Sequence, residues 1–139
     1  MTIENIKELI RSSKYDFLRL DRHLGHNIIL LALGGSYAYG TNNENSDVDI
    51  RGCALNSKYE LLTVNNKFDQ FINEESDTTI YSFNKLIQML TNCNPNTIEL
   101  LGLRPEHYLF ISEIGKELLS NRKLFLSKKC IHSFGGYAF

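Results

Sequence analysis

Long apolar runs are absent from this sequence of 139 residues. The longest one, Ile28 to Leu33, is far shorter than the roughly 20 residues that a helix needs to cross a membrane. Residues 1–5 contain neither the basic segment nor the apolar segment with which a secretory signal begins. The sequence therefore predicts no membrane-spanning helix, no secretory leader and no contact with a membrane.

Cysteine is also scarce. The three cysteines, Cys53, Cys93 and Cys130, lie far apart and form neither a Cys-x-x-Cys pair nor a spacing typical of a metal site. An odd number of separate cysteines fits a reducing compartment, so we expect free thiols and a cytoplasmic location.

A strong excess of charge is missing as well. The 15 basic and 16 acidic residues give a net charge of −1, which argues against a polycation that binds nucleic acid with its whole surface. The charge is uneven, however, because residues 121–139 contain no acidic residue and four basic ones, Arg122, Lys123, Lys128 and Lys129. A basic segment on an acidic body can mark a contact with phosphate, although a solvated helix face is the plainer explanation.

The overall composition is ordinary for a folded domain. Hydrophobic residues make up 42% of the chain and charged residues 22%, which argues against disorder and against a coiled coil. Eight Phe and seven Tyr provide bulk for a hydrophobic core. At roughly 150 residues per domain, residues 1–139 are expected to form one domain.

Apolar periodicity predicts strands in the middle of the chain and helices on either side of them. Strands are expected at residues 27–33, 47–55, 67–72 and 77–81. Two short helices are expected within residues 2–24, broken near residues 12–13 and stopped by Gly25. Further helices are expected at residues 36–39, 57–62, 83–90, 94–101, 112–120 and 121–127.

Two of these helices have clear start signals. Ser82 or Asn84 can cap the helix at 83–90, and Asn94-Pro95 supplies a cap and a first-turn proline for the next one. The pattern as a whole predicts an α/β (α+β) fold, with a mixed central sheet and flanking helices that pack mainly on one face.

A glycine-rich turn, Gly34-Gly35-Ser36, follows the first expected strand. The helix expected after it presents free backbone N–H groups and the positive end of its dipole, and both favour a phosphate. Glycine lets an anion approach the backbone closely, and the Ser36 hydroxyl adds a donor. Taken alone, such a turn after a strand usually has no further role.

The next expected strand contains two aspartates, Asp47 and Asp49, followed by Arg51. Because alternate residues share one face of a strand, these three side chains should point one way, and Val48 and Ile50 should point into the core. Two neighbouring carboxylates repel each other unless a cation lies between them, and oxygen ligands suit Mg²⁺ or Mn²⁺. An isolated pair of this kind is more often a solvated strand face.

The glycine turn and the aspartate pair together indicate a function more specifically than either does alone. The turn can hold the phosphates of an NTP, and the aspartates can hold the metal ions that bridge these phosphates. The combination resembles the signature of the DNA polymerase beta-like nucleotidyltransferase superfamily: a hydrophobic residue, Gly-Ser, a short spacer and Asp-x-Asp. In this chain ten residues separate Gly35-Ser36 from Asp47-Val48-Asp49.

More narrowly, the chain is similar to a predicted nucleotidyltransferase family with members linked to RNA repair. The patterns of that family are Gly-Ser-x-Ala-Tyr-Gly, Ser-Asp-x-Asp-x-Arg-Gly, and Asn-Pro-Asn followed by Glu-Leu-Leu. They match residues 35–40, 46–52, 94–96 and 99–101, and the resemblance extends over residues 30–139.

The resemblance implies a polymerase beta-like fold and a metal-dependent enzyme. Such an enzyme transfers a nucleoside monophosphate from an NTP, for example ATP, to a hydroxyl group on an RNA end, a protein or a small molecule. A third carboxylate on a neighbouring strand is implied beside Asp47 and Asp49, completing a site for Mg²⁺ or Mn²⁺. Asp77 is the first candidate, because it opens an expected strand ahead of Tyr81-Ser82 and Lys85, as in the family, and Asp69 is the alternative.

The resemblance also implies a role for each of these residues. The three carboxylates are catalytic residues and metal ligands, and Asp77 also takes the proton of the acceptor hydroxyl. Gly35 and Ser36 hold the triphosphate. Arg51 contacts a phosphate or braces the aspartates, unless it forms a surface ion pair, and Lys85 reaches a phosphate unless it is solvated.

Other polar residues are expected to have no direct role. Asn94-Pro95-Asn96 and Glu99 are expected to be structural, as parts of a capped helix whose glutamate bonds locally, with contact to substrate as the alternative. Cys53 shares the strand face of Asp49 and could lie near the site, but the mechanism needs no thiol nucleophile.

Two departures from the family bear on activity. Tyr37 stands where many members have a basic residue, which removes one expected phosphate contact. The family usually continues past residues 135–138 into further helices, so these C-terminal helices are expected to be absent or truncated here. The alternative function is therefore a catalytically inactive nucleotide-binding protein, or a regulatory or partner-binding one, although the intact aspartate pair favours the enzyme.

Overall fold

The computed structural model of this protein describes residues 1–43, 45, 47–63, 68–128 and 130. In these residues five strands form one sheet in the spatial order β3-β4-β2-β1-β5. They are β1 (Ile28–Leu33), β2 (Ile50–Ala54), β3 (Gln70–Asn73), β4 (Thr78–Ser82) and β5 (Tyr108–Ile111). Strands β2 and β4 are parallel and the other neighbouring pairs are antiparallel, so the expected mixed sheet is confirmed.

The helices found in the described residues are short. They are α1 (Ile3–Leu9), α2 (Phe17–Leu20), α3 (Gly35–Tyr39), α4 (Lys58–Leu62), α5 (Phe83–Thr91), α6 (Pro95–Leu101) and α7 (Glu113–Ser120). Single 3-10 turns lie at Ser13–Tyr15, Gly25–Asn27, Pro105–His107 and Arg122–Phe125. None of these helices has the length and apolar character that would let it cross a membrane.

Polar side chains cap most of the helices. Ser82, not Asn84, caps α5 by accepting a hydrogen bond from the backbone N–H of Lys85. Asn94 caps α6 in the same way, and Pro95 occupies the first turn, as the sequence predicts. The exception that matters for the site is α3, whose cap residue is Gly34 and has no side chain to offer.

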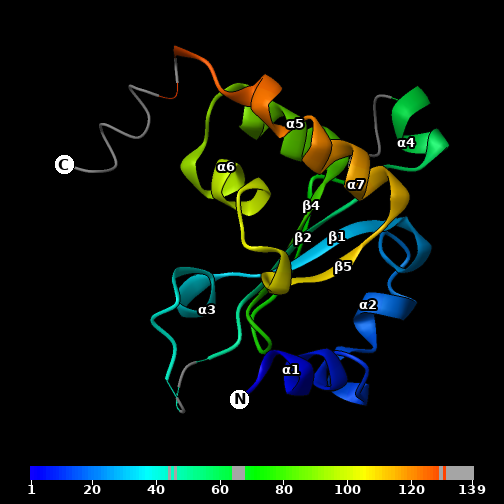
Figure 1. The fold of residues 1–139 in the computed structure, drawn as a ribbon. Coiled ribbons are helices and arrows are strands. Elements are labelled where there is room, and N and C mark those ends of the chain that lie inside the picture. Colours follow the sequence, from blue (N-terminus) through cyan, green and yellow to red (C-terminus); the bar gives the residue numbers. More distant parts are fainter. Residues whose placement is uncertain (44, 46, 64–67, 129, 131–139) are drawn as a thin grey trace.

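Helices cover both faces of the sheet (Figure 1). On one face, α5, α6 and α7 contribute Leu86, Leu100 and Leu118 to a core cluster with Ile29 and Cys53. The other face carries the N-terminal helices, whose Tyr15 and Leu18 pack near Leu31 and Ile80. Because both faces are covered, β1 is buried at every position. The expected packing mainly on one face therefore describes α5 to α7 but not α1 and α2.

Several boundaries differ from the sequence prediction. Strand β2 begins only at Ile50, and the expected helix at 121–127 is reduced to the turn Arg122–Phe125. Helix α2 ends at Leu20, and Gly25 instead starts a 3-10 turn with a φ of 64°. Strand β5 was not expected, because four residues are too few for a periodic signal. The predicted start of β3, Lys67, lies outside the described residues.

Two of the three cysteines form a disulfide. Cys93, between α5 and α6, is bonded to Cys130, and their Cα atoms are 5.0 Å apart. The expectation of free thiols is therefore wrong for this pair, and the argument from unpaired cysteines to a reducing compartment loses its basis. Cys53 is free, and its thiol is fully buried in the core, which raises its pKa to about 12.

Candidate active site

The parallel pairing of β2 and β4 brings two of the predicted carboxylates together. Ile50 of β2 pairs with Thr78 of β4, so the residues directly before the two strands, Asp49 and Asp77, lie side by side. The backbone N–H of Ile50 donates to the carbonyl oxygen of Asp77 at 3.0 Å. A side-chain hydrogen bond then links the two carboxyl groups. We call Asp49 and Asp77 the carboxyl pair.

The guanidinium group of Arg51 holds Asp77 in place. Its Nη1 donates to the carbonyl oxygen of Asp77 at 2.8 Å, and its Nη2 donates to the Asp77 carboxylate at 3.2 Å. Asp77 has a φ of 45°, which is uncommon for a residue other than glycine. Such backbone strain persists only where surrounding contacts support it, and Arg51 supplies two of them.

The glycine turn after β1 lies against Asp49. Leu33, the last residue of β1, pairs with Ile50, and the N–H of Gly34 donates to the carbonyl oxygen of Asp49 at 2.9 Å. Gly35 has a φ of 55°, and a Cβ atom at this position would overlap the Asp49 carboxyl group. Glycine therefore allows α3 to begin directly beside the carboxyl pair.

Crowding of these charges shifts the pKa values of the carboxyl pair in opposite directions. Burial first, then the hydrogen bond and charge of Asp77 and the charge of Asp47, together raise the pKa of Asp49 to about 6, against the lowering effect of Arg51. The hydrogen bond from Asp49 lowers the pKa of Asp77, and Arg51 lowers it further. The pair thus holds one proton at mildly acidic pH. A carboxyl group that titrates this close to neutrality is typical of a functional site.

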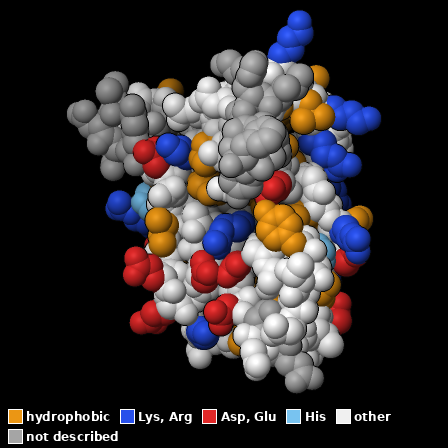
Figure 2. Space-filling view, turned by 90° about the vertical axis from the view of Figure 1, so that its left-hand side faces the viewer, with side chains coloured by type: hydrophobic (Ala, Val, Ile, Leu, Met, Phe, Trp, Pro, Cys, Tyr) orange, Lys and Arg blue, Asp and Glu red, His pale blue; other side chains and the backbone are white. Residues whose placement is uncertain are grey.

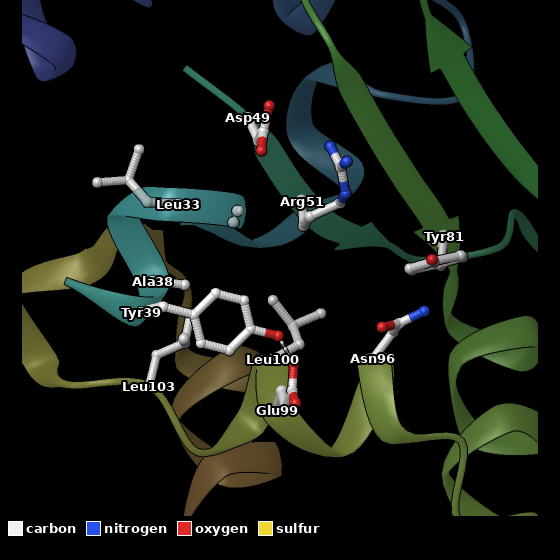
Figure 3. Close-up of a pocket in the computed structure, with 12 residues that line it drawn as sticks. Leu33, Ala38, Tyr39, Asp49, Arg51, Tyr81, Asn96, Glu99, Leu100 and Leu103 are labelled. Carbon is white, nitrogen blue, oxygen red and sulfur yellow. Dashed lines mark hydrogen bonds between the residues drawn. The ribbon is translucent and has the colours of Figure 1, made fainter. Parts of the chain in front are cut away.

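Asp49 and Arg51 line one end of a cavity of about 260 Å³. Figure 3 shows the labelled side chains around an open space, with Asp49 and Arg51 on one side and Asn96 and Glu99 of α6 across from them. The remaining lining residues are Leu33, Gly34, Gly35, Ala38, Tyr39, Tyr81, Leu100 and Leu103. Hydrophobic walls with a few polar groups are typical of sites for small molecules.

The cavity belongs to the face of the molecule that carries α3 and α6. The space-filling view of this face shows several acidic side chains gathered in its lower half, next to basic ones near the middle (Figure 2). This distribution agrees with the partly exposed ion pair between Arg51 and Asp77, in which opposite charges lie together.

A hydrogen bond connects α3 to α6 beside the cavity. The hydroxyl group of Tyr39 donates to Oε2 of Glu99 at 2.6 Å. Asn96 and Glu99 lie one turn apart on α6, so both can face the cavity. The sequence predicts the capped helix correctly, and its residues also line the site.

Tyr39 and Tyr81 also line the cavity, and the sequence motifs in which they lie give neither of them a role. Tyr39 could have been found from the turn length of α3, which returns residue 39 to the side of Gly35. Tyr81 could have been found from the alternation along β4, where it lies on the half-buried face.

Four predicted site residues do not line the cavity. Asp77 contacts Asp49 but is not part of the cavity wall. Ser36 is half-buried on α3, next to the lining residue Gly35, and Lys85 is half-buried on α5. Asp47 is exposed, because β2 begins at Ile50 and the strand alternation does not extend back to it. Its charge is nevertheless close enough to raise the pKa of Asp49.

Asp69, the alternative third carboxylate, lies at the far end of β4 from Asp77. Strands β3 and β4 are antiparallel, and the carbonyl oxygen of Asp69 accepts a hydrogen bond from the N–H of Ser82 at 2.7 Å. Asp77 precedes the first residue of β4 instead. The geometry therefore favours Asp77 over Asp69 as the partner of Asp49.

Tyr37 does not face the cavity. Its side chain is buried in a core cluster with Ile6 and Leu33, so the departure from the family at this position affects the core and not the cavity lining. Ser46, Lys129 and residues 135–138, which sequence analysis also names, lie outside the described residues.

The carboxyl pair has the chemistry of a site for a divalent cation. Two adjacent carboxyl groups provide the oxygen ligands that Mg²⁺ and Mn²⁺ prefer, and a cation between them would relieve the repulsion that helps to raise the pKa of Asp49. Within the described residues, however, His, Cys, Asp and Glu side chains do not gather in any group of three that could hold a metal ion. The predicted convergence of Asp47, Asp49 and Asp77 is therefore seen for two of the three.

A family model described as the RNA repair pathway DNA polymerase beta family matches residues 10–139. The match includes β1, α3, β2, β4 and α6, the elements that line the cavity. No curated protein and no solved structure matches the sequence.

Proposed function

This chain belongs to the RNA repair pathway DNA polymerase beta family, and we propose that it is a metal-dependent nucleotidyltransferase that moves a nucleoside monophosphate from an NTP to a hydroxyl acceptor. The observation that carries the proposal is the position of the carboxyl pair. Asp49, which is linked to Asp77, lies against the Gly34-Gly35 turn at one end of a cavity, so groups suited to metal ions and to phosphates meet in one place.

The phosphates of the NTP belong beside the glycine turn. Helix α3 starts without a side-chain cap, and backbone N–H groups at such a start favour a phosphate. Gly34 and Gly35 line the cavity here, and Ser36 follows them on α3. The positive charge of Arg51 lies at the same end of the cavity.

Asp49 and Asp77, with Asp47 from the preceding loop, would hold Mg²⁺ or Mn²⁺. The bound cation would neutralise charge on the phosphates and orient the reacting oxygen atoms. The charge of Asp47 already acts on Asp49, which supports including it in this set of ligands.

In the proposed reaction, the acceptor oxygen forms a bond with the α-phosphorus of the NTP. The bond from this phosphorus to the oxygen shared with the β-phosphate breaks, and pyrophosphate leaves. The proton of the acceptor hydroxyl passes to the carboxyl pair. The family resemblance implies this role for Asp77 alone, but the shared hydrogen bond favours the pair as one acceptor.

An RNA end is the acceptor that the family description favours over a protein or a small molecule. Arg122, Lys123 and Lys128 are exposed on the segment after α7 and add positive charge that an RNA backbone would attract. These residues are separate from the cavity lining, as expected for contacts with an extended acceptor.

Label transfer tests the proposed function. The protein would be incubated with NTPs labelled at the α-phosphate, Mg²⁺ and RNA with free hydroxyl ends, and both labelled RNA and pyrophosphate would be measured. We expect both products, and we expect EDTA and Asp49→Asn to remove them. NTP binding without either product, for RNA, protein and small-molecule acceptors alike, would instead support a nucleotide-binding protein without turnover.

A further inference from the structure

The cavity end away from the carboxyl pair has a composition that phosphate binding does not require. Here α6 supplies the carboxylate of Glu99, the amide of Asn96 and the hydrophobic Leu100, and the loop after α6 supplies Leu103. Tyr39 lies next to Glu99 and donates its hydroxyl hydrogen bond to it. Where no metal ion is expected to lie between them, a carboxylate repels phosphate, so this end suits another part of the ligand.

We infer that this end is a nucleobase subsite that selects bases whose Watson–Crick edge has an amino group beside an unprotonated ring nitrogen, adenine and cytosine over hypoxanthine and uracil. The inference rests on the proposed nucleotidyltransferase function, because it places the base of the NTP relative to its phosphates. It adds the residues that choose the base, Glu99 and Asn96, and a positioning residue, Tyr39.

The shape and walls of the subsite fit a flat ring. Aromatic side chains from α3 and β4, Tyr39 and Tyr81, and the aliphatic Leu100 and Leu103 line the cavity beside the polar groups of α6 (Figure 3). Any base can stack on an aromatic ring or pack against an aliphatic wall, whichever polar groups it carries at its edge. The walls therefore account for binding of a base but not for a choice among bases.

The choice among bases comes from the polar side of the subsite, formed by Glu99 and Asn96. An ionised Glu99 side chain offers acceptors only, and it already accepts from Tyr39 through Oε2. An amino group on the base can donate to the second carboxylate oxygen, and the amide of Asn96 can donate to the neighbouring ring nitrogen. A base that is held in the same orientation but has a carbonyl oxygen in place of the amino group would direct an acceptor at Glu99 and its ring N–H, a donor, at the amide hydrogens of Asn96.

The hydrogen bond between Tyr39 and Glu99 could also serve only to tie α3 to α6. That structural role predicts a change in stability when the bond is lost and no change in the preference among bases. The preference is therefore the quantity to measure.

Nucleosides test the subsite without phosphate or metal. Adenosine and inosine, and likewise cytidine and uridine, differ by one amino group and its neighbouring ring proton, and their affinities can be measured by NMR titration in EDTA. We expect the amino-bearing nucleoside of each pair to bind about tenfold more tightly, the effect of a hydrogen bond to a charged group. Equal affinities within both pairs, or no chemical-shift changes at Tyr39 and α6, would overturn the inference.

Glu99→Gln is the decisive variant, because an amide can donate to a carbonyl oxygen as readily as it accepts. We expect the preference for adenosine over inosine to fall to about onefold to threefold, with the melting temperature little changed. Glu113→Gln is the matched control, since its side chain is 90% exposed on α7. A preference that survives Glu99→Gln unchanged would assign the choice elsewhere and overturn this role.

Pyrophosphate release with ATP and ITP separates this inference from the proposed function. If nucleosides are discriminated but no NTP releases pyrophosphate, the proposed transfer fails and the base subsite stands. If ATP and ITP release pyrophosphate equally well and the nucleosides bind equally, transfer stands and the base subsite fails.

Discussion

The carboxyl group of Asp49 occupies the space that a side chain at Gly35 would need. This contact joins the glycine turn and the aspartate motif, which the sequence shows only as separate parts, into one site. Position 35 requires glycine for two reasons: the φ of 55° is unfavourable for other residues, and a Cβ atom would overlap the carboxyl group of Asp49.

Gly35→Ala is therefore expected to lower the free energy of unfolding by about 2–4 kcal/mol, from backbone strain and from the steric overlap together. The carboxyl group of Asp49 would have to move, so pyrophosphate release should fall by a larger factor than stability alone explains. Chemical denaturation and the label-transfer assay measure the two effects.

Gly40→Ala separates strain from overlap. Gly40 has a similar φ of 70°, but nothing lies within 4 Å of a Cβ atom there. This variant should lose only about 1 kcal/mol of stability and keep its activity. Equal losses in both variants would show that the contact between Gly35 and Asp49 has no importance of its own.

The raised pKa of Asp49 predicts how stability depends on pH when no metal is bound. Between the ordinary value of 3.8 and the folded value of about 6, the folded state holds more protons than the unfolded state. The free energy of unfolding should therefore decrease as pH rises through this window. The pKa of Asp77 is lowered, so at pH values below its ordinary pKa this residue makes the free energy of unfolding increase with pH.

The difference between wild type and Asp49→Asn isolates this contribution. Denaturation in EDTA from about pH 4 to pH 7 should show a steeper fall with pH for wild type than for the variant, because the variant has no carboxyl group to ionise at this position. Parallel curves for the two proteins would mean that Asp49 ionises normally and is not crowded by Asp77.

Arg51→Lys tests the two hydrogen bonds through which Arg51 holds Asp77. Lysine keeps the charge but cannot donate in parallel to the carbonyl and the carboxylate of Asp77, which Arg51 does at 2.8 and 3.2 Å. We expect a loss of about 1 kcal/mol in stability and a lower affinity for Mg²⁺ with NTP. Exposed Arg104→Lys should change neither, and a similar loss there would point to a general effect of the substitution.

Local sequence predicts those parts of the fold that depend on neighbouring residues. The buried strand β1, the cap at Ser82 and the Asn94-Pro95 start of α6 are each visible in a few residues, and the structure confirms them. The same holds for the glycine turn, because a strand followed by Gly-Gly-Ser specifies where α3 begins.

Features that depend on tertiary packing were beyond the sequence. The meeting of Cys93 and Cys130 follows from the path of the chain after α7, and no local motif encodes it. Asp49 reaches Asp77 because β2 and β4 are parallel, a register that hydrophobic patterning alone does not fix. The exposed position of Asp47 has a similar cause, since strand pairing stops at Ile50.

The disulfide between Cys93 and Cys130 predicts a simple labelling result. In denaturant without reductant, an alkylating reagent should modify only Cys53, and all three cysteines should react after reduction. Because the bond closes a separation of 37 residues, reduction should lower the free energy of unfolding by about 2–4 kcal/mol. Cys93→Ser should show no further loss on reduction, and three reactive thiols without reductant would contradict the bond.

Asp49→Asn gives the sharpest test of the proposed metal site. The substitution keeps the size of the side chain but removes a charge, and Asp49 lies at the cavity rather than in the core, so folding should survive. Wild type should be stabilised by Mg²⁺ with a non-hydrolysable NTP, by about 2.7 kcal/mol at a hundredfold excess over Kd, and the variant should lose most of this gain. Melting curves with and without the ligands measure it.

Asp69→Asn is the matched control for this last prediction, because it makes the same chemical change at the other end of β4. A ligand must bind the folded state to stabilise it, so a residue outside the site should leave the ligand-induced shift intact. We expect the full shift in Asp69→Asn, little shift in Asp49→Asn and an intermediate one in Asp47→Asn, whose side chain is exposed and acts from the loop. If the shift instead persists in Asp49→Asn and disappears in Asp69→Asn, the third carboxylate has been assigned to the wrong end of β4, and the carboxyl pair does not bind the metal.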